Sequence, residues 1–356
     1  MPKPQRFPMG IPYGWYFVGY SDELAPGEVR PHHYFGRDLV MFRNEQGQAG
    51  LLDAYCPHLG AHLGHGGHVK GDSIHCPFHG WSYRPDGFCS GIPYAKTMPA
   101  ITQRQAVIHA YPLTEANGII WAWYHPANIA PLFEVEVYPE FTDPGWVKQI
   151  RFEWRCAINP QEVAENGVDV AHFQFIHSSK AVPEGFSHYD GHKRQTGSDG
   201  WREIELPGGG TRRIELSVRT SMNGPGQKIS ILSGVTSVAL MTIVTPIEAD
   251  DAELRFCFTH HEAEPGSQAE ADYKQAVTNI AGPNGVLADL PIWNHKIHRA
   301  KPILCDGDGP ILRFRQYFEQ FYAPEGAPAQ AAAEPRVQTI GAGRPIPWRN
   351  NWTAIS

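Results

Sequence analysis

The first third of the chain alternates apolar and polar residues in short runs that glycine, proline and asparagine separate. Residues 11–52 contain three such runs, and 119–126 form one more. An alternation of period two between turn residues is typical of antiparallel strands with one buried face. The stretch 126–144 is then rich in proline and ends this pattern. We therefore predict an antiparallel β domain and place its boundary within this stretch.

The character of the chain changes after this boundary. The spacing of apolar residues predicts a helix over 161–175, and β-branched and aromatic runs predict strands at 212–222, 228–246 and 253–263. Helical spacing returns over 267–300 and 308–322. These elements predict an α+β fold, in which the second domain is an antiparallel sheet flanked by helices. The predicted units are 1–140, 141–325 and a flexible C-terminal tail at 326–356.

Composition excludes several classes of function. Of the 356 residues 42% are hydrophobic, no run is long and apolar enough to span a membrane, and the formal net charge of −7 argues against a nucleic-acid surface. The first residues have no apolar segment of a secretory signal, so we expect a cytoplasmic protein. The chain has 18 histidines, which makes metal binding the first chemistry to consider.

Two short motifs each supply one cysteine and one histidine. Cys56 and His58 form a C-x-H motif, and Cys76 and His79 form a C-x2-H motif further along. A Rieske [2Fe–2S] cluster requires two thiolates on one iron and two imidazoles on the other. Neighbouring glycines allow backbone N–H groups to approach the sulfides. A structural zinc site of the Cys2His2 type is the alternative, but its usual motifs pair cysteine with cysteine and histidine with histidine.

A second group of potential metal ligands lies in the segment ENGVDVAHFQFIH. Here Asp169 precedes His172 by one helical turn, and His177 follows five residues later. Because residues five apart do not share a face of a straight helix, the two imidazoles meet only if the helix distorts or ends there. Mononuclear non-haem iron sites use two histidines and one carboxylate. The downstream aspartates that could complete such a site are Asp190, Asp199, Asp250, Asp251, Asp272, Asp289, Asp306 and Asp308.

The segments CPHLGAHLGHGG and CPFHGW resemble the cluster loops of Rieske non-haem iron oxygenases. KGDSIHCPFHGW and the segment LCDGDGPILRFRQYFEQFY are similar to the 3-ketosteroid 9α-hydroxylase and cholesterol 7-desaturase group. The resemblance implies that an aspartate at the start of the last long helix completes the iron site. It favours Asp308, beside Gly309 and Pro310, over Asp306. The implied cofactors are the cluster and a mononuclear Fe(II), with O2 as co-substrate.

The resemblance also implies how electrons travel. In the family an aspartate at the position of Asp169 links a cluster histidine of one subunit to an iron histidine of the next, here His79 and His172. A homotrimer is therefore expected. Electrons are expected from an NAD(P)H-dependent flavin or iron–sulfur reductase or a ferredoxin, because this chain has no glycine-rich fingerprint for a dinucleotide.

The expected activity is that of the terminal oxygenase component of a monooxygenase that hydroxylates a bulky hydrophobic, steroid-like substrate. Desaturation, and oxidative O- or N-demethylation of a steroid or a small aromatic compound, are the alternatives within the enzyme class. Outside it, a Rieske electron carrier and a zinc-binding module remain as alternatives.

Overall fold

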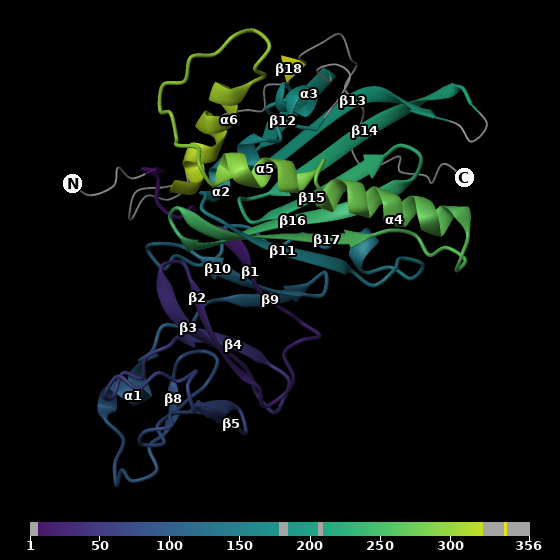
Figure 1. Cartoon of the computed structure of the whole chain (residues 1–356). Coiled ribbons are helices and arrows are strands. Elements are labelled where there is room, and N and C mark those ends of the chain that lie inside the picture. Colours follow the sequence, from purple (N-terminus) through teal and green to yellow (C-terminus); the bar gives the residue numbers. More distant parts are fainter. Residues whose placement is uncertain (1–5, 178–183, 206–208, 323–337, 340–356) are drawn as a thin grey trace.

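The N-terminal part of the computed structural model is built from small antiparallel sheets. The structure describes residues 6–177, 184–205, 209–322 and 338–339. One sheet has the order β1-β10-β9, a second β2-β3-β4 and a third β5-β6-β7-β8, with the short helix α1 beside them (Figure 1). The elements are β1 (Gly14–Tyr20), β2 (Val29–Tyr34), β3 (Arg37–Arg43), β4 (Ala49–Asp53), β5 (His68–Lys70), β6 (Ser73–His75), β7 (Ser82–Tyr83), β8 (Cys89–Gly91), α1 (Ala100–Arg104), β9 (Leu113–Ala116) and β10 (Ile119–Tyr124).

The C-terminal part is an antiparallel sheet of eight strands with the order β11-β17-β16-β15-β14-β13-β12-β18. Helices lie over one face of this sheet, and the N-terminal strands lie beneath it (Figure 1). The predicted α+β class is confirmed. The elements are η1 (Pro139–Phe141), β11 (Ile150–Cys156), α2 (Pro160–Glu165), α3 (His172–Phe175), β12 (Glu184–Asp190), β13 (Lys193–Glu205), β14 (Thr211–Asn223), β15 (Gln227–Ser233), β16 (Ser237–Glu248), β17 (Asp251–Thr259), α4 (Gln268–Ala281), α5 (Val286–Trp293), α6 (Ile311–Phe318), η2 (Glu319–Tyr322) and β18 (Gln338–Thr339).

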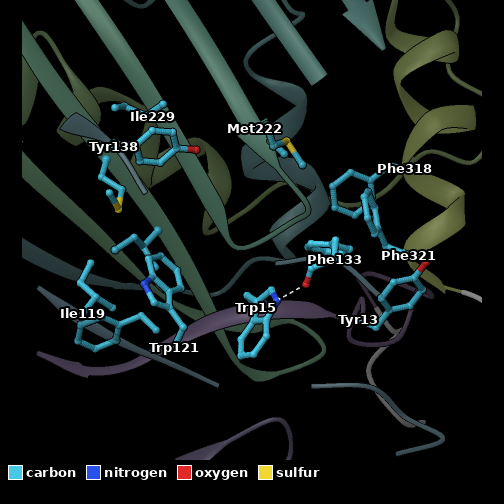
Figure 2. Close-up of a cluster of buried hydrophobic side chains, with 14 of the residues drawn as sticks. Tyr13, Trp15, Ile119, Trp121, Phe133, Tyr138, Met222, Ile229, Phe318 and Phe321 are labelled. Atoms are coloured by element: carbon cyan, nitrogen blue, oxygen red, sulfur yellow. Dashed lines mark hydrogen bonds between the residues drawn. The ribbon is translucent and has the colours of Figure 1, made fainter. Parts of the chain in front are cut away.

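One hydrophobic core joins the two parts of the chain. Side chains of the large sheet, among them Ile229 on β15, belong to one cluster with the aromatic residues Trp15 of β1 and Trp121 of β10 (Figure 2). The indole Nε1 of Trp15 donates to the carbonyl oxygen of Phe133 at 2.6 Å, and Thr245 donates to the carbonyl oxygen of Phe17 at 3.0 Å. Because each buried indole removes a large apolar area from water, this core holds the two parts together.

The predicted helix over 161–175 is interrupted. The structure has α2, then a turn, then the single-turn helix α3. The side chain of Asn159 caps α2 by accepting from the N–H of Gln161 at 3.0 Å. Gly167 follows the end of α2, and an added Cβ there would lie 2.7 Å from Nη2 of the buried Arg194, so a larger residue would require that side chain to shift. The break carries the chain from the buried α2 toward His172.

The division at residues 140 and 141 stays a prediction, since the shared core gives no independent test of it. Most of the predicted tail at 326–356 lies outside the described residues. Within it the structure describes β18 (Gln338–Thr339), which pairs with β12 at the sheet edge. The last predicted helix begins at Ile311 rather than 308, after Pro310.

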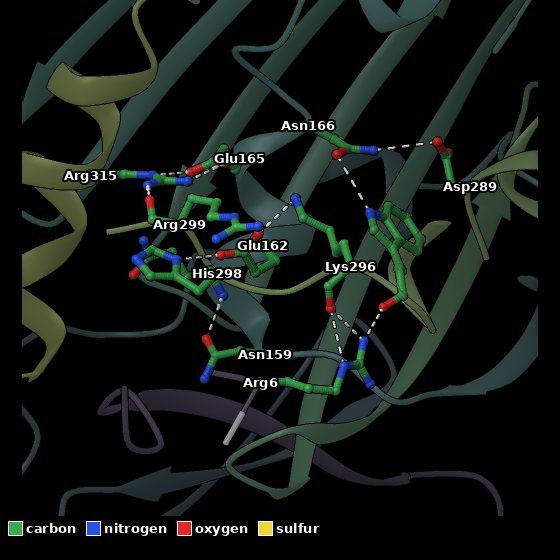
Figure 3. Close-up of polar contacts among 12 residues, drawn as sticks. Arg6, Asn159, Glu162, Glu165, Asn166, Asp289, Lys296, His298, Arg299 and Arg315 are labelled. Carbon is green, nitrogen blue, oxygen red and sulfur yellow. Dashed lines mark hydrogen bonds and ion pairs between the residues drawn. The ribbon is translucent and has the colours of Figure 1, made fainter. Parts of the chain in front are cut away.

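A buried ionic network fixes α2 to the segments that follow α5 (Figure 3). The carboxylate of Glu162 is fully buried and contacts His298 at 2.7 Å and Lys296 at 2.6 Å. Glu165, at the other end of α2, accepts two hydrogen bonds from Arg315 on α6, at 2.7 and 3.0 Å. These pairs hold α2 in position from two sides.

Replacing Glu162 by glutamine is expected to lower the free energy of unfolding by about 3 kcal/mol, because Lys296 then loses its charged partner and His298 faces a neutral amide in place of the buried carboxylate. Burial acts to raise the pKa of Glu162, but Lys296 and His298 outweigh it and hold this pKa below its ordinary value. The contribution of Glu162 is therefore present above the pKa of the unfolded carboxyl and is lost as pH falls through the folded pKa. Urea unfolding from pH 3 to pH 7 would measure it.

The matched control is Glu270→Gln on α4, which removes a surface ion pair with Lys274. Such exposed pairs contribute little to stability. Equal losses in the two variants would show that the Glu162 network does not stabilise the fold.

Candidate iron sites

Two similar loops hold the cysteines of the predicted cluster. In each loop the N–H of a glycine donates to the carbonyl oxygen of the cysteine four residues earlier, Gly60 to Cys56 at 2.9 Å and Gly80 to Cys76 at 3.0 Å. Both glycines have positive φ, 76° and 72°, which other residues rarely adopt. The two tight turns bury both thiols, which are 2% and 3% exposed.

The four predicted cluster ligands converge at one end of the N-terminal part. The ring centroids of His58 and His79 are 4.8 Å apart, and His58 stacks on Trp81 at 4.7 Å. The Nδ1 atom of His79 is buried and has no hydrogen-bond partner among the described residues. Burial raises the pKa of the Cys56 thiol, and the neighbouring Cys76 thiol acts in the same direction. An unpartnered imidazole nitrogen beside paired thiols fits a metal cluster, whose positive charge would hold both sulfurs as thiolates.

Tyr83 supplies a hydrogen bond to this site, because its buried hydroxyl lies 3.0 Å from Cys56 Sγ. Hydrogen bonds to ligand sulfur stabilise the more negative, reduced cluster. Tyr83→Phe is expected to lower the reduction potential by roughly 40 mV, which corresponds to about 1 kcal/mol for one electron. A redox titration followed by EPR would measure the shift.

Tyr94→Phe is the control, since its hydroxyl accepts from Trp81 at 2.9 Å instead of contacting a sulfur. If the potential of the Tyr83→Phe protein stays at the wild-type value, the hydroxyl does not bond the cluster.

The structure brings the two histidines of the second motif together. His172 opens α3, which ends at Phe175, and the chain then turns so that the rings of His172 and His177 lie 5.1 Å apart. This is the helix end that the spacing required.

The third member of this group is Asp289, not Asp308. Ligand atoms of His172, His177 and Asp289 all lie within 4.8 Å of one another, and His177 Nε2 is 3.4 Å from the Asp289 carboxylate. Asp289 projects from the first turn of α5 and is only 8% exposed.

The prediction of Asp308 as the third ligand is therefore corrected. Asp308 accepts the N–H of Cys305 at 2.6 Å and closes a local turn before α6, so its carboxylate is used within its own loop. Asp306 lines the cavity described below, but it is not a member of the metal-binding group. A signal for Asp289 was present in the sequence VLADLPIW, where it is the single charged residue of an otherwise apolar helix. A lone carboxylate on such a helix is typical of a buried polar site.

Surrounding backbone groups orient both imidazoles. His172 Nδ1 contacts the carbonyl oxygen of Asp169, and His177 Nδ1 lies 3.1 Å from that of Asn284. Each contact leaves Nε2 free for a metal. Burial lowers the pKa of His172. Burial acts in the same direction on His177, but Asp289 outweighs it and raises that pKa. Two histidines and one carboxylate are the donor set of mononuclear non-haem iron sites.

Asp169 lies beside His172 but far from the cluster of its own chain. Its carboxylate oxygen is 3.3 Å from the His172 N–H and 3.9 Å from Nδ1, and its side chain is 39% exposed. The cluster loops belong to the end of the molecule that holds β5 and β8, opposite the end that holds α3 (Figure 1). The predicted link between His79 and His172 is therefore not made within one chain.

A cavity of about 870 Å³ adjoins His172, His177 and Asp289. Its floor is the helix-covered face of the large sheet, and its walls come from α3, α4 and α5. Most of its lining is apolar, including Phe173, whereas Phe175 is 79% exposed and points away. The further apolar residues of the lining are Val163, Val168, Val170, Phe186, Val218, Leu232, Leu240, Phe256, Ile280, Val286 and Trp293. Among the described residues no helix is long and apolar enough to cross a membrane.

Comparison with protein families matches both parts of the chain. Residues 14–111 match the Rieske [2Fe-2S] domain, and residues 122–322 match the 3-ketosteroid 9alpha-hydroxylase C-terminal domain. A probable 3-ketosteroid-9-alpha-monooxygenase, oxygenase component, of Rhodococcus rhodochrous is 30% identical over 331 residues, which cover 87% of this chain and 79% of the relative. A cholesterol 7-desaturase of Xenopus laevis is 31% identical over 352 residues and covers 89% and 73%.

Solved structures share the fold at lower identity. Apo dicamba monooxygenase aligns with a TM-score of 0.67 at 16% identity, over 87% of this chain and 96% of that one. NdmA of Pseudomonas putida CBB5 with caffeine aligns with a TM-score of 0.70 at 17% identity, over 95% and 98%.

These matches decide the class of the protein. Oxygenase components of this kind take electrons from a separate reductase and use O2 as co-substrate, with a Rieske cluster and a non-haem iron as cofactors. The match of residues 122–322 to an oxygenase domain removes the support for a simple electron carrier or a zinc module. The chain belongs to the Rieske non-haem iron oxygenases, in the group that shares the catalytic domain of 3-ketosteroid 9α-hydroxylases.

Proposed function

We propose that this oxygenase hydroxylates a bulky, apolar, steroid-like substrate, with an activity like that of 3-ketosteroid 9α-hydroxylases. The observation that carries the proposal is the cavity of about 870 Å³, which is lined mainly by apolar side chains and opens onto His172, His177 and Asp289. A cavity of this size accepts a polycyclic molecule. The printed names of several relatives, 3-ketosteroid monooxygenases and cholesterol 7-desaturases, support the same substrate class.

The proposed ligands of the cluster are Cys56, His58, Cys76 and His79, and those of the mononuclear iron are His172, His177 and Asp289. When bound, the cluster supplies single electrons and the iron activates O2 for oxidation of a C–H bond. The protein contributes the fixed imidazoles and a cavity from which apolar walls exclude water. Phe173 and Trp293 line this cavity and restrict the positions that a rigid ring system can take.

A steroid panel tests the proposal. The iron-loaded enzyme is incubated with each compound, O2, NADH and a surrogate reductase, and products are identified by mass spectrometry. We expect a product that has gained one oxygen atom from at least one polycyclic ketone. Turnover of small aromatic ethers together with exclusion of all steroids would contradict the proposal.

Two other outcomes have support in the comparisons. The cholesterol 7-desaturase relatives favour desaturation, which removes two hydrogens from the substrate and adds no oxygen. Oxidative O- or N-demethylation is the further alternative, and it removes a methyl group as a one-carbon product. Because the three reactions change substrate mass differently, the same incubations distinguish them.

The cluster loops and α3 lie at opposite ends of one chain, which supports a homotrimer in which Asp169 links His172 to His79 of the next subunit. The side chain of Asp169 accepts the His172 N–H but is 39% exposed, so it can accept a second contact. Apolar residues of the cluster loops are also exposed, Leu59 at 64% and Phe78 at 61%. Light scattering is expected to give three times the chain mass of 39.7 kDa. A monomeric mass in the active preparation would contradict it.

The electron donor is proposed to be an NAD(P)H-dependent flavin or iron–sulfur reductase or a ferredoxin. A cytoplasmic location agrees with two cluster cysteines that must stay reduced before the metal binds. The proposed domains remain 1–140 and 141–325.

A further inference from the structure

We infer that Lys228 forms a carboxylate-binding position in the substrate cavity, so that the substrate is an acid with a bulky apolar body. The inference adds to the proposed function. It rests on that proposal only for the claim that the rest of the substrate is bulky and apolar. It concerns a residue that plays no part in holding either metal site.

Lys228 stands on the floor of the cavity. It lies on β15 and pairs with Met222 on β14 and with Thr242 on β16, so its side chain shares the cavity face with Thr242. Both Lys228 and Thr242 line the cavity, together with Ser230 two residues along β15. Among the described residues the Lys228 ammonium has no hydrogen bond or ion pair. The ammonium is therefore available to a ligand in the cavity.

The surroundings make an unpaired ammonium costly. Burial lowers the pKa of Lys228 to about 8, and the nearby guanidinium of Arg194 acts in the same direction. Arg194 is itself only 1% exposed, and its Nε and Nη1 atoms are buried without a hydrogen-bond partner. Asp289 acts to raise the pKa of Lys228. Because Asp289 is a proposed ligand of the iron, its carboxylate is not available as a partner for the ammonium. Two desolvated cations without a carboxylate of their own create a positive potential at this end of the cavity.

The ligand that best fits this position is a carboxylate. It would neutralise the ammonium and accept a further hydrogen bond from a hydroxyl on the floor, where Thr220 Oγ1 and Ser230 Oγ lie 2.8 Å apart. A neutral carbonyl group could accept one hydrogen bond from Lys228, but it would leave the charge in place. The apolar remainder of the lining then requires that the rest of the ligand be hydrophobic.

Paired ligands test the inference on the iron-loaded enzyme without reductase. One pair is a cholanic acid and its methyl ester, and the other is para-methoxybenzoic acid and its methyl ester. Dissociation constants are measured by calorimetry at pH 7. An acid is expected to bind at least tenfold more tightly than its ester, as a charge-assisted hydrogen bond predicts.

Lys228→Met is expected to reduce the acid-to-ester ratio to about one while ester binding persists, which also shows that the variant is folded. Lys228→Arg is expected to restore most of the ratio. Lys148→Met removes a surface lysine that is 80% exposed, and it is expected to leave the ratio unchanged.

A wild-type protein without preference for either acid, or a Lys228→Met protein that keeps the preference, would overturn the inference. Equal binding of acid and ester in both pairs would overturn it, and measurable binding of the cholanic pair would then leave the steroid proposal standing. A Lys228-dependent preference seen with para-methoxybenzoic acid alone would support the inference and contradict the steroid proposal.

Discussion

Replacing Asp289 by alanine is expected to remove the mononuclear iron and to leave the cluster in place. The two imidazoles that remain, His172 and His177, do not make a stable site without the buried carboxylate that lies 3.4 Å from His177. Iron is expected to fall from about three to about two per chain, with acid-labile sulfide unchanged at about two. Product formation is expected to fall at least 100-fold. Metal analysis after addition of Fe(II), together with EPR of the reduced protein, measures both quantities.

Asp308→Ala and Asp306→Ala are the matched controls on the neighbouring aspartates. Asp308→Ala loses a hydrogen bond to Cys305 but is expected to keep the iron. Retention of iron by Asp289→Ala, or its loss from Asp308→Ala, would restore the assignment that the sequence resemblance implied.

Asp169→Asn is expected to lower turnover about 100-fold while both metal sites stay filled. His172 Nδ1 keeps its contact with the backbone carbonyl oxygen of residue 169, and the asparagine side-chain oxygen can still accept the His172 N–H, so the imidazole keeps its orientation in this variant. What changes is the charge of the exposed carboxylate that would bond to an imidazole of the next subunit. Single-turnover experiments would show normal reduction of the cluster by the reductase and slow product formation.

Asp272→Asn on the surface of α4 is the control, and it is expected to turn over normally. Mixed assemblies give an independent measurement. Subunits that lack the cluster (Cys76→Ala) and subunits that lack the iron (Asp289→Ala) should regain activity when they are co-expressed, if electrons cross between subunits. Wild-type turnover in Asp169→Asn would remove the proposed bridge.

The parts of the two proposed sites that are local in the chain could be predicted from the sequence. Two short loops contain Cys56, His58, Cys76 and His79, and one segment contains His172 and His177. The spacing within these segments is therefore enough to suggest metal ligands. Asp289 belongs to a separate helix, and only the packing of α5 against the large sheet brings it to the histidines. Spacing along the chain contains no such information. The resemblance pointed instead to the aspartate nearest the last helix.

The predicted helices and strands show the same difference between local patterns, which the sequence contains, and long-range contacts, which it does not. Alternating runs predicted the antiparallel sheets, because a half-buried strand requires that alternation. The helix over 161–175 was predicted as continuous because its apolar spacing runs across Gly167. At this interruption Gly167 lies close to Arg194 of β13, a contact between distant parts of the chain that apolar spacing does not contain.

The aromatic core shared by the two parts limits how oxygenases of this kind can be recombined. Trp15, Phe17 and Trp121 come from the N-terminal part, whereas Met241 and Cys257 come from the large sheet. A chimera that joins this catalytic domain to another protein's electron-transfer domain would place foreign side chains against Met241 and Cys257. Because close packing tolerates changes of volume poorly, such a chimera should fold well only when the residues of β1 and β10 are transplanted together with their partners on the sheet.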